Sequence, residues 1–205
     1  MKKIAYWLKR FTRRILKIVL YFLVIIVYRP KKVGEKNIPK EGSYILCANH
    51  VHALDAVALV LSIKREIIFI AKKELFSNPI FHWLGYNFDV IAVKRGSADV
   101  EAIKLSLKAL KNGKLLGLFP EGTRNGMAKG AKLHNGAVNM ALKTNTKIIP
   151  IGIQGNFKPF RKIKFNIGKP IDFSEYVSRQ KDKETLDMLT KQVMDEVIKL
   201  TNEKI

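Results

Sequence analysis

The sequence predicts an α/β fold, a largely parallel sheet flanked by helices, with a separate N-terminal helix in front of it. Two observations indicate this. From residue 31 onward, short apolar runs alternate with segments of helical period, the pattern expected when helices connect parallel strands. Residues 1–30 are instead basic and apolar and contain no Asp or Glu. We therefore expect an N-terminal helical segment over residues 1–30 and a globular domain over residues 31–205.

Composition limits the class of protein. The 205 residues, 47% of them apolar, suffice for one domain with a real core, which excludes a disordered chain. The single cysteine, Cys47, excludes an intramolecular disulfide framework and fits a reducing compartment. The 38 Lys and Arg residues outnumber the 17 Asp and Glu residues, for a net charge of +21. The expected partner is therefore anionic: a phospholipid surface, a nucleic acid, or an acidic or phosphorylated substrate.

The N-terminal segment concentrates this charge. Residues 1–36 contain eleven Lys and Arg residues and one acid, Glu35, so their net charge is +10. On a helical wheel, six apolar residues share one face: Ile4, Trp7, Leu8, Phe11, Ile15 and Ile18. The basic residues from Lys2 to Lys17 fall on the opposite face. Because such a helix suits the headgroup boundary of a bilayer, we predict a membrane-anchoring helix here.

An uncharged run of eleven residues, 18–28, follows this amphipathic stretch. A helix that crosses a bilayer needs about 20 apolar residues. The run therefore favours an anchor that lies in the membrane plane or re-enters it, and a true span with Lys17 snorkelling stays an alternative. Basic residues flank both ends and indicate no orientation. Tyr28-Arg29-Pro30 offers no signal-peptide cleavage site.

Six short apolar runs are predicted to form the strands of the sheet. They cover residues 44–48, 66–71, 88–93, 115–119, 147–153 and 163–167. Pro150 interrupts the fifth run, which an edge strand or a bulge would accommodate. Ligands of such sheets collect where parallel strands end, so the residues that follow each strand are the candidates for chemistry.

Three segments have helical period, residues 98–112, 136–144 and 185–201. In the first, Val100, Ile103, Leu107 and Leu110 share a face, and Gly113 follows where a C-cap is expected. In the last, the shared face consists of Leu186, Leu189, Val193, Val197 and Leu200. These apolar faces are expected to pack on the sheet.

A histidine and an aspartate follow the first predicted strand, in the run Asn49-His50-Val51-His52-Ala53-Leu54-Asp55. Five residues of regular helix would turn Asp55 away from His50. A strand-to-helix bend can instead bring the imidazole and the carboxylate together. The carboxylate would then fix the tautomer and make the other ring nitrogen a better proton acceptor, which is a base able to activate a hydroxyl.

Anion-binding residues follow two other strands. Residues 119–124 read Phe-Pro-Glu-Gly-Thr-Arg. In this hexapeptide Gly122 permits close backbone approach to a ligand, Thr123 offers a hydroxyl, and Arg124 offers a two-pronged donor for phosphate. Lys94 and Arg95 add two cations after the third predicted strand. Each piece alone is also compatible with an ordinary solvated turn.

Together and in this order, the pieces resemble the glycerolipid acyltransferase family, typified by 1-acylglycerol-3-phosphate acyltransferase. His50 and Asp55 match its HX4D motif, Arg95 matches the arginine of its second block, and Pro150 matches the proline of its fourth. Residues 119–124 are its Phe-Pro-Glu-Gly-Thr-Arg block complete. The resemblance covers roughly residues 33–170.

The resemblance implies transfer of a fatty acyl group from a thioester, acyl-CoA or acyl-carrier protein, to the 2-hydroxyl of lysophosphatidate, giving phosphatidate. No cofactor or metal is implied. His50 would be the general base oriented by Asp55, and the acceptor oxygen would attack the thioester directly without an acyl-enzyme. The residues expected to hold the acceptor phosphate are Arg95, Gly122, Thr123 and Arg124, with Glu121 shaping their loop. Lys94 is a possible oxyanion or phosphate contact, and a backbone N–H near the motif is the other candidate oxyanion donor.

The resemblance also implies membrane phospholipids as partners, no nucleic acid, and a location at the cytoplasmic face of the cell membrane. Alternatives stay open. The acceptor could be glycerol 3-phosphate or another lysophospholipid, and a non-enzymatic protein that binds acidic lipid or nucleic acid is a remote reading. His52, where the family often has a small hydroxyl residue, is a rival base. Cys47 is expected to be a buried core residue, and His82 and His134 structural or surface residues.

Overall fold

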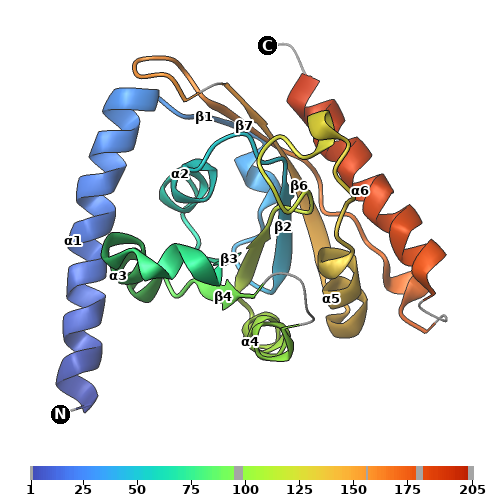
Figure 1. The fold of residues 1–205 in the computed structure, drawn as a ribbon, viewed down its shortest axis with the longest axis horizontal. Helices are drawn as coiled ribbons and strands as arrows, with labels where there is room; N and C mark the ends of the chain where they lie inside the picture. The colour runs from blue at the N-terminus through green and yellow to red at the C-terminus, as the bar shows by residue number, and fades with distance from the viewer. Residues whose placement is uncertain (1, 95–98, 156, 179–181, 203–205) are drawn as a thin grey trace.

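The computed structural model describes residues 2–94, 99–155, 157–178 and 182–202, with the backbone alone for residues 2–10, 14, 17 and 25. Its centre is one seven-stranded sheet with the order β1-β7-β6-β2-β5-β3-β4 (Figure 1). The strands are β1 (Lys31–Val33), β2 (Tyr44–Ala48), β3 (Ile67–Lys72), β4 (Ile91–Val93), β5 (Leu115–Leu118), β6 (Lys147–Gln154) and β7 (Lys164–Ile167).

The sheet is mostly parallel, as predicted, with one antiparallel step. Neighbouring strands pair in parallel except β6 and β7, whose register runs from Ile151↔Ile167 to Gln154↔Lys164. Because β1 pairs in parallel with β7, these two strands run against the other five. Strands β2, β3, β4, β5 and β6 therefore all end at one side of the sheet, which we call the carboxyl edge.

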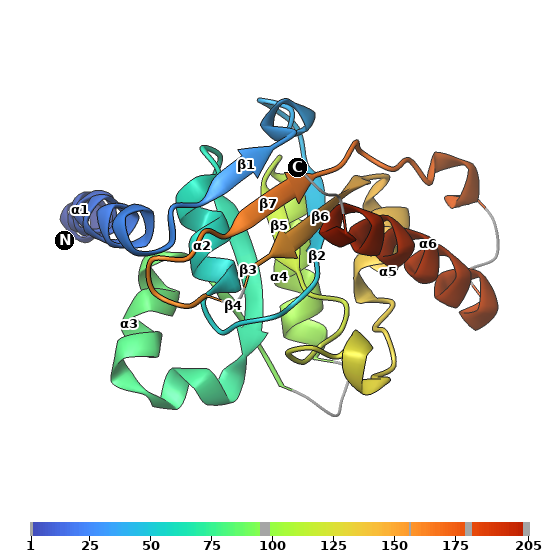
Figure 2. The same ribbon diagram turned by 90° about the horizontal axis from the view of Figure 1, so that it is seen from above.

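Helices cover both faces of the sheet. They are α1 (Lys2–Tyr28), α2 (Asp55–Ser62), α3 (Pro79–Asn87), α4 (Val100–Lys111), α5 (Gly136–Thr144) and α6 (Lys183–Asn202). Short 3-10 helices, η1 (Glu35–Asn37), η2 (Lys73–Ser77), η3 (Met127–Lys129) and η4 (Ser174–Tyr176), lie in the connections. Helix α2 lies between α1 and the sheet, whereas α5 and α6 cover the opposite face (Figure 2).

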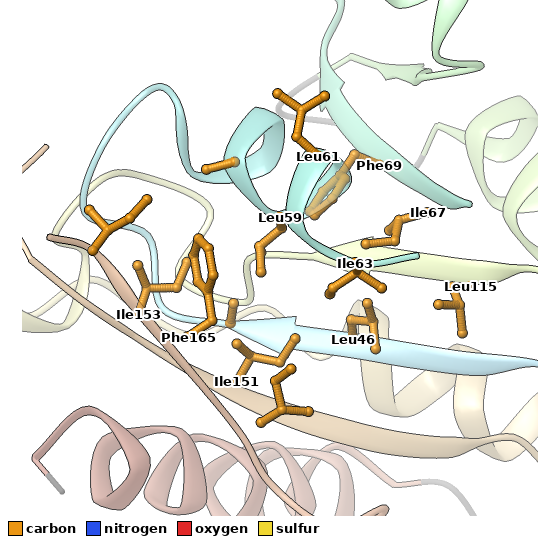
Figure 3. Packing of buried hydrophobic residues seen from close by; sticks show 14 of the residues in the cluster. Leu46, Leu59, Leu61, Ile63, Ile67, Phe69, Leu115, Ile151, Ile153 and Phe165 are labelled. Atoms are coloured by element: carbon orange, nitrogen blue, oxygen red, sulfur yellow. The ribbon is translucent and has the colours of Figure 1, made fainter. Parts of the chain in front are cut away.

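The core is divided by the sheet into two layers, because successive strand residues point to opposite faces. On one face, Leu46 and Ala48 of β2 pack with Leu59 of α2 and with Phe69 and Phe165 (Figure 3). On the other face, the two β2 residues that alternate with them pack against α4, α5 and α6. These are Ile45 and Cys47, which contact a cluster that includes Leu110, Val138 and Val193.

The predicted elements agree with the structure at most positions. The predictions for β2 and α5 match residue for residue, those for β5, β6 and β7 differ by one residue at one end, and those for β3, α4 and α6 differ by one or two residues at each end. Residue 98, the predicted start of α4, lies outside the described residues. The prediction for residues 88–93 is wrong at its start, because Phe88 caps α3 and β4 begins only at Ile91. The strand-to-helix bend expected at residues 49–55 leads into α2, but the bounds of α2, and α3 and β1 altogether, were not predicted. The apolar residues of α2 and α3 have no clear single face, and β1 has only one apolar residue, Val33.

The predicted buried face of α4 is partly wrong. The structure buries Ala102, Ser106, Ala109 and Leu110, whereas Val100 and Ile103 are exposed. The small side chains allow α4 to lie close to β4, β5 and α5, which rotates the larger residues outward. Gly113 follows the Asn112 cap with φ +72°, and its N–H donates to Leu110, so the predicted helix end is confirmed.

Pro150 lies in β6, a central strand between β7 and β2, so an edge position is not the explanation for this proline. Its carbonyl accepts from the Gly168 N–H at 2.9 Å. The amide and carbonyl of one strand residue point to the same side, so the missing N–H falls on the β7 side. At that position β7 has already ended, at Ile167, so the missing N–H removes no hydrogen bond of the β6–β7 ladder. The hydrogen bonds between β6 and β2 are unaffected, because the Pro150 nitrogen does not point toward β2.

Helix α1 is continuous over 27 residues, and its second half packs on the core layer that includes α2. Val24 is buried among core residues that include Phe157, and Leu20 and Tyr28 pack partly against the same layer. The large apolar residues on the outer side of α1 remain exposed: Phe11, Ile15, Ile18, Val19, Phe22, Leu23 and Ile26. Among the described residues, no helix combines the length and apolar character that a membrane crossing requires.

Candidate active site

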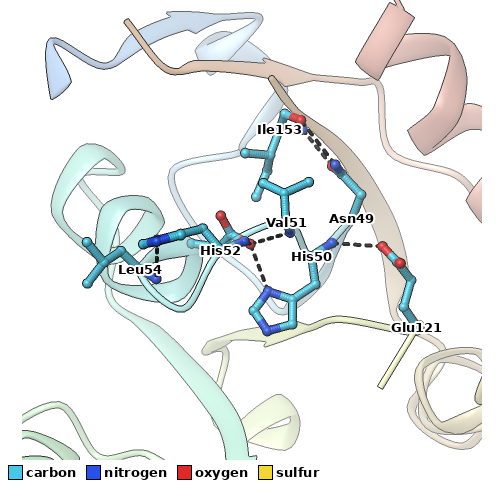
Figure 4. Close-up of polar contacts among 8 residues, drawn as sticks. Asn49, His50, Val51, His52, Leu54, Glu121 and Ile153 are labelled. Carbon is cyan, nitrogen blue, oxygen red and sulfur yellow. Dashed lines mark hydrogen bonds and ion pairs between the residues drawn. The ribbon is translucent and has the colours of Figure 1, made fainter. Parts of the chain in front are cut away.

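The candidate site forms at the carboxyl edge, where β2 passes into α2. β2 ends at Ala48, the chain turns through a loop, and Asp55 begins α2. This turn brings His50 back over the helix start, and its Nδ1 lies 2.7 Å from Oδ2 of Asp55 (Figure 4). The predicted His–Asp pair is therefore present, because the bend brings together two side chains that a regular helix would hold apart.

Asp55 is completely buried, and the loop backbone surrounds its carboxylate. Besides the His50 ring, Oδ2 accepts from the N–H groups of Val51 and His52 at 2.7 and 2.8 Å. A carboxylate can only accept, so this contact favours the neutral tautomer in which Nδ1 carries the proton and Nε2 keeps its lone pair. The His50 side chain keeps 20% of its surface exposed, so a ligand can reach this nitrogen.

Two buried polar side chains hold the His50 loop to the rest of the edge. The Asn49 side chain accepts from the N–H of Ile153 in β6 and donates to its carbonyl, at 2.7 and 3.0 Å. The N–H of His50 donates to Oε1 of Glu121 at 2.8 Å, and the His50 carbonyl accepts from Asn125 at 2.6 Å. The loop after β2 is thus tied to the loop after β5 by backbone and carboxylate hydrogen bonds.

Glu121 faces the protein rather than an open pocket. It is 3% exposed, and its second oxygen, Oε2, accepts from the Met127 N–H at 2.8 Å. With both oxygens bound to backbone amides, this carboxylate braces the segment between β5 and η3. That arrangement agrees with a loop-shaping role better than with direct ligand contact.

The next three residues of the hexapeptide are reachable. Gly122 has φ +61°, a conformation that L side chains rarely adopt, and a Cβ there would lie 2.5 Å from the His134 ring. Thr123 is half-buried, and the Arg124 side chain is exposed. His134 is an exposed residue whose N–H donates to Pro120. The backbone conformation therefore favours glycine at position 122, and a side chain there would also displace the exposed His134 ring.

The second predicted cationic group is described only in part. Lys94 follows β4, its side chain is exposed, and its N–H donates to Asp99 at 2.9 Å. Arg95 lies outside the described residues. Strands β5 and β3 separate β4 from β2, which places the end of β4 about 14 Å along the sheet from the His50 loop.

The rival base His52 is oriented differently from His50. Its Nδ1 accepts from the Leu54 N–H at 3.2 Å, and its ring stacks on Phe157 with 4.8 Å between centroids. Phe157 also contacts Tyr28 at the end of α1, whereas the His50 ring stacks on Phe119 at 4.2 Å. Asp55 contacts the backbone N–H of His52, but no carboxylate contacts the His52 ring among the described contacts, so of the two imidazoles only that of His50 has an acidic partner there.

The other candidate residues are separate from this site. Cys47 is fully buried in β2, and burial raises the pKa of its thiol to about 12. His82 is an exposed residue of α3. Within the described part of the chain, no three His, Cys, Asp or Glu side chains gather as metal ligands. Sequence reasoning missed Asn49, Asn125 and Phe157, whose roles depend on contacts with distant segments.

Comparison with known proteins identifies the class of enzyme to which this fold and His–Asp site belong. A family model described as Acyltransferase matches residues 29–154. The chain therefore belongs to the acyltransferase family. The match includes the β2–α2 loop and the hexapeptide after β5, and it ends with β6.

Named relatives narrow this class. A 1-acyl-sn-glycerol-3-phosphate acyltransferase of Borreliella burgdorferi is 34% identical over 142 residues, covering 66% of this chain and 55% of that protein. One of Bacillus subtilis is 29% identical over 182 residues, covering 84% of this chain and 88% of that protein. This chain thus spans about half of the first relative and most of the second.

A solved structure has the same fold. The 1-acyl-sn-glycerophosphate acyltransferase PlsC of Thermotoga maritima superposes with a TM-score of 0.67 and 25% sequence identity. The superposition covers 94% of this chain and 83% of that protein. The similarity therefore extends beyond the family match to nearly all of the elements described above.

Proposed function

We propose that this protein transfers a fatty acyl group from an acyl thioester to the 2-hydroxyl of 1-acylglycerol 3-phosphate, giving phosphatidate for phospholipid synthesis. The observation that carries the proposal is the 2.7 Å contact between His50 Nδ1 and Asp55 Oδ2 at the carboxyl edge. The names of the Borreliella and Bacillus relatives support the choice of acceptor. The donor is acyl-CoA or acyl-carrier protein, and no cofactor takes part.

His50 acts as the general base. Nε2 takes the proton of the acceptor hydroxyl as its oxygen attacks the thioester carbonyl. The new C–O bond forms, the C–S bond breaks, and the departing thiolate takes up the proton from the imidazolium. Asp55 holds the ring orientation and stabilises the transient imidazolium, as a buried carboxylate does in other His–Asp pairs. No covalent acyl-enzyme is needed.

The residues after β5 bind the acceptor phosphate. Arg124 supplies a guanidinium that can donate two parallel hydrogen bonds, Thr123 supplies a hydroxyl, and Gly122 lets the backbone approach the ligand. Arg95 adds a second guanidinium, and Lys94 beside it is a possible phosphate contact. The end of β4 is too far from the His50 loop for Lys94 to reach the oxyanion, so a backbone N–H near His50 is the candidate oxyanion donor. Glu121 contributes by shaping this loop, since both of its oxygens bind backbone amides.

Residues 1–30 anchor the domain formed by residues 31–205 to phospholipid, and the anchor lies in the membrane plane. The exposed apolar residues of α1 and the basic charge of its sequence support this arrangement. An anchor of this kind keeps the site at the surface where a lysophospholipid acceptor resides. The cytoplasmic face of the cell membrane is the proposed location, because acyl-CoA and acyl-carrier protein are cytoplasmic donors.

The test is acyl transfer by the purified protein in lipid, with acyl-CoA and acyl-carrier protein as donors. Lysophosphatidate, glycerol 3-phosphate and a second lysophospholipid serve as acceptors. His50→Ala is expected to abolish product. His52→Ala is expected to leave the protein active, because it retains the His50 base and its Asp55 carboxylate. Product from glycerol 3-phosphate alone would identify glycerol 3-phosphate as the acceptor instead of lysophosphatidate. An active His50→Ala variant would refute the role of His50 as the general base.

A further inference from the structure

Helix α3 exposes large apolar side chains that the catalytic site does not use. The nine residues of this helix are Pro-Ile-Phe-His-Trp-Leu-Gly-Tyr-Asn. Ile80 is 66% exposed, Phe81 46%, Trp83 50% and Tyr86 61%. A water-facing helix of a soluble domain rarely presents an isoleucine and three aromatic rings together. This surface, Ile80, Phe81, Trp83 and Tyr86, is here called the α3 aromatic surface.

Helix α3, which carries the α3 aromatic surface, contacts α1 through the residues at its C-terminal end. Thr12 of α1 contacts the Asn87 side chain at the end of α3, and Arg13 donates to Asp89 at 2.8 Å. Both ribbon views place α3 beside α1 on the same side of the molecule (Figures 1 and 2). The apolar residues of α1 and the α3 aromatic surface can therefore contact one partner.

The position and charge around α3 indicate what that partner is. Helix η2 starts directly after β3, so α3 begins at the carboxyl edge, the side that also holds His50. A cavity of about 520 Å³ between η2, α3 and β4 is lined by Lys73 and His82 together with apolar residues such as Phe76 and Tyr86. A cation beside aromatic rings matches the headgroup region of a bilayer, where Trp and Tyr concentrate and anionic phosphates lie.

We propose that α3 is a second membrane-contacting element, which inserts the α3 aromatic surface into the headgroup boundary of an anionic phospholipid bilayer. With α1 it forms a two-helix contact that turns the carboxyl edge toward the lipid. The inference rests on the proposed function in one respect, that the acceptor is a lipid. The contact itself is independent of catalysis, because none of its residues belongs to the catalytic machinery.

Trp83 provides a direct probe, because the chain has only one other tryptophan, Trp7. The full-length Trp7→Phe protein is mixed with phosphatidylglycerol–phosphatidylcholine vesicles, and the emission of Trp83 is recorded. A blue shift, together with quenching by lipids brominated near the headgroup end of the acyl chain, is the expected result. Vesicle-bound protein with unchanged and unquenched Trp83 emission would overturn the proposal, as would failure to bind vesicles.

A matched pair of variants tests whether vesicle binding depends on the α3 aromatic surface or on exposed apolar side chains in general. Trp83→Ser is expected to weaken partitioning into vesicles about tenfold, from the apolar area withdrawn from lipid. Met188→Ser removes an exposed apolar side chain from α6, on the opposite side of the sheet, and is expected to leave partitioning unchanged. Equal effects of the two substitutions would refute a specific contact through α3.

Two further outcomes are distinguishable. A blue shift of Trp83 that grows with protein concentration without lipid would assign the surface to a second copy of the chain and overturn the proposal. Transfer activity measured with substrates in detergent micelles tests the proposed function separately, and Trp83→Ser should retain it. Lipid quenching of Trp83 in a protein without transfer activity would leave the membrane contact standing and refute the proposed reaction.

Discussion

The imidazole of His50 and the carboxylate of Asp55 meet at 2.7 Å, although His50 belongs to the loop after β2 and Asp55 to the first turn of α2. The same carboxylate oxygen accepts from the N–H groups of Val51 and His52. The bond that orients the candidate base therefore also holds the loop in its turn. A change at Asp55 should affect both the loop and the ring that it orients.

Asp55→Asn tests the orientation of His50. The amide keeps an oxygen that can accept from the loop amides, but it has no negative charge to hold the Nδ1 proton or stabilise an imidazolium. We expect kcat to fall by roughly 100-fold or more, within the usual range for general-base catalysis. The measurement is steady-state transfer with a circular dichroism spectrum as the control for folding. A folded variant with unchanged kcat would show that the carboxylate has no part in the reaction.

Gly122 and Gly130 form a matched pair for the loop after β5. Both have positive φ, +61° and +66°, but a Cβ at 122 would meet the His134 ring at 2.5 Å, whereas nothing lies within 4 Å of one at 130. Gly130→Ala should cost about 1 kcal/mol of unfolding free energy from backbone strain alone. Gly122→Ala should cost somewhat more, because the exposed His134 ring must turn away from the new Cβ, and it should raise the KM for the acceptor.

Thermal unfolding measures the first effect, at about 2–4 °C per kcal/mol for a chain of this size. The change in the KM for the acceptor is measured by kinetics with varied acceptor concentration at a fixed donor concentration. Equal losses in the two glycine variants, with an unchanged KM, would mean that the loop accommodates a side chain at 122.

Cys47 is expected to be chemically silent in the folded protein. Burial raises the pKa of its thiol to about 12, so almost no thiolate exists near neutral pH. An aromatic disulfide reagent at pH 8 should label the thiol only after unfolding in guanidinium. Cys47→Ala should keep kcat within about twofold while losing some stability from the small cavity it leaves. Rapid labelling, with activity lost in step, would instead support a cysteine nucleophile.

The ion pair between Lys147 and Asp172 predicts an acid-sensitive contribution to stability. The pair spans 2.8 Å, and the hydrogen bond from Lys147 lowers the pKa of Asp172 to about 2. A carboxyl whose pKa is lower in the folded state stabilises it above the unfolded pKa of about 4. That stabilisation is lost as the pH falls from 4 to 2.

The measurement is the difference in Tm between the wild type and Asp172→Asn, followed from pH 7 down to pH 2. The difference should be constant near neutral pH and shrink below pH 4. Asp195→Asn, at an exposed position on α6, is the control for the general loss of a carboxylate. A difference that stays constant to pH 2 would show that the pair contributes nothing through the charge of Asp172.

Local patterns in the sequence were sufficient for most elements and for the membership of the site. β2 and α5 follow directly from an apolar run and a helical period, because burial on one or both faces imposes those patterns. The His50–Asp55 pair and residues 119–124 were predictable because their chemistry requires particular side chains at short spacings. The residue types at the site are thus a property of the chain alone.

Only the tertiary structure decided how distant segments meet. The antiparallel step at β7, the close packing of α4 through Ala102 and Ser106, and the exposure of α3 depend on which surfaces become neighbours. The same holds for the hydrogen bonds of Asn49 to Ile153 and of Glu121 to the His50 amide, which join residues 104 and 71 positions apart. A hydrogen bond leaves no periodic mark on the sequence. The sequence therefore determined which groups this protein has available for chemistry, and the fold determined which of them touch.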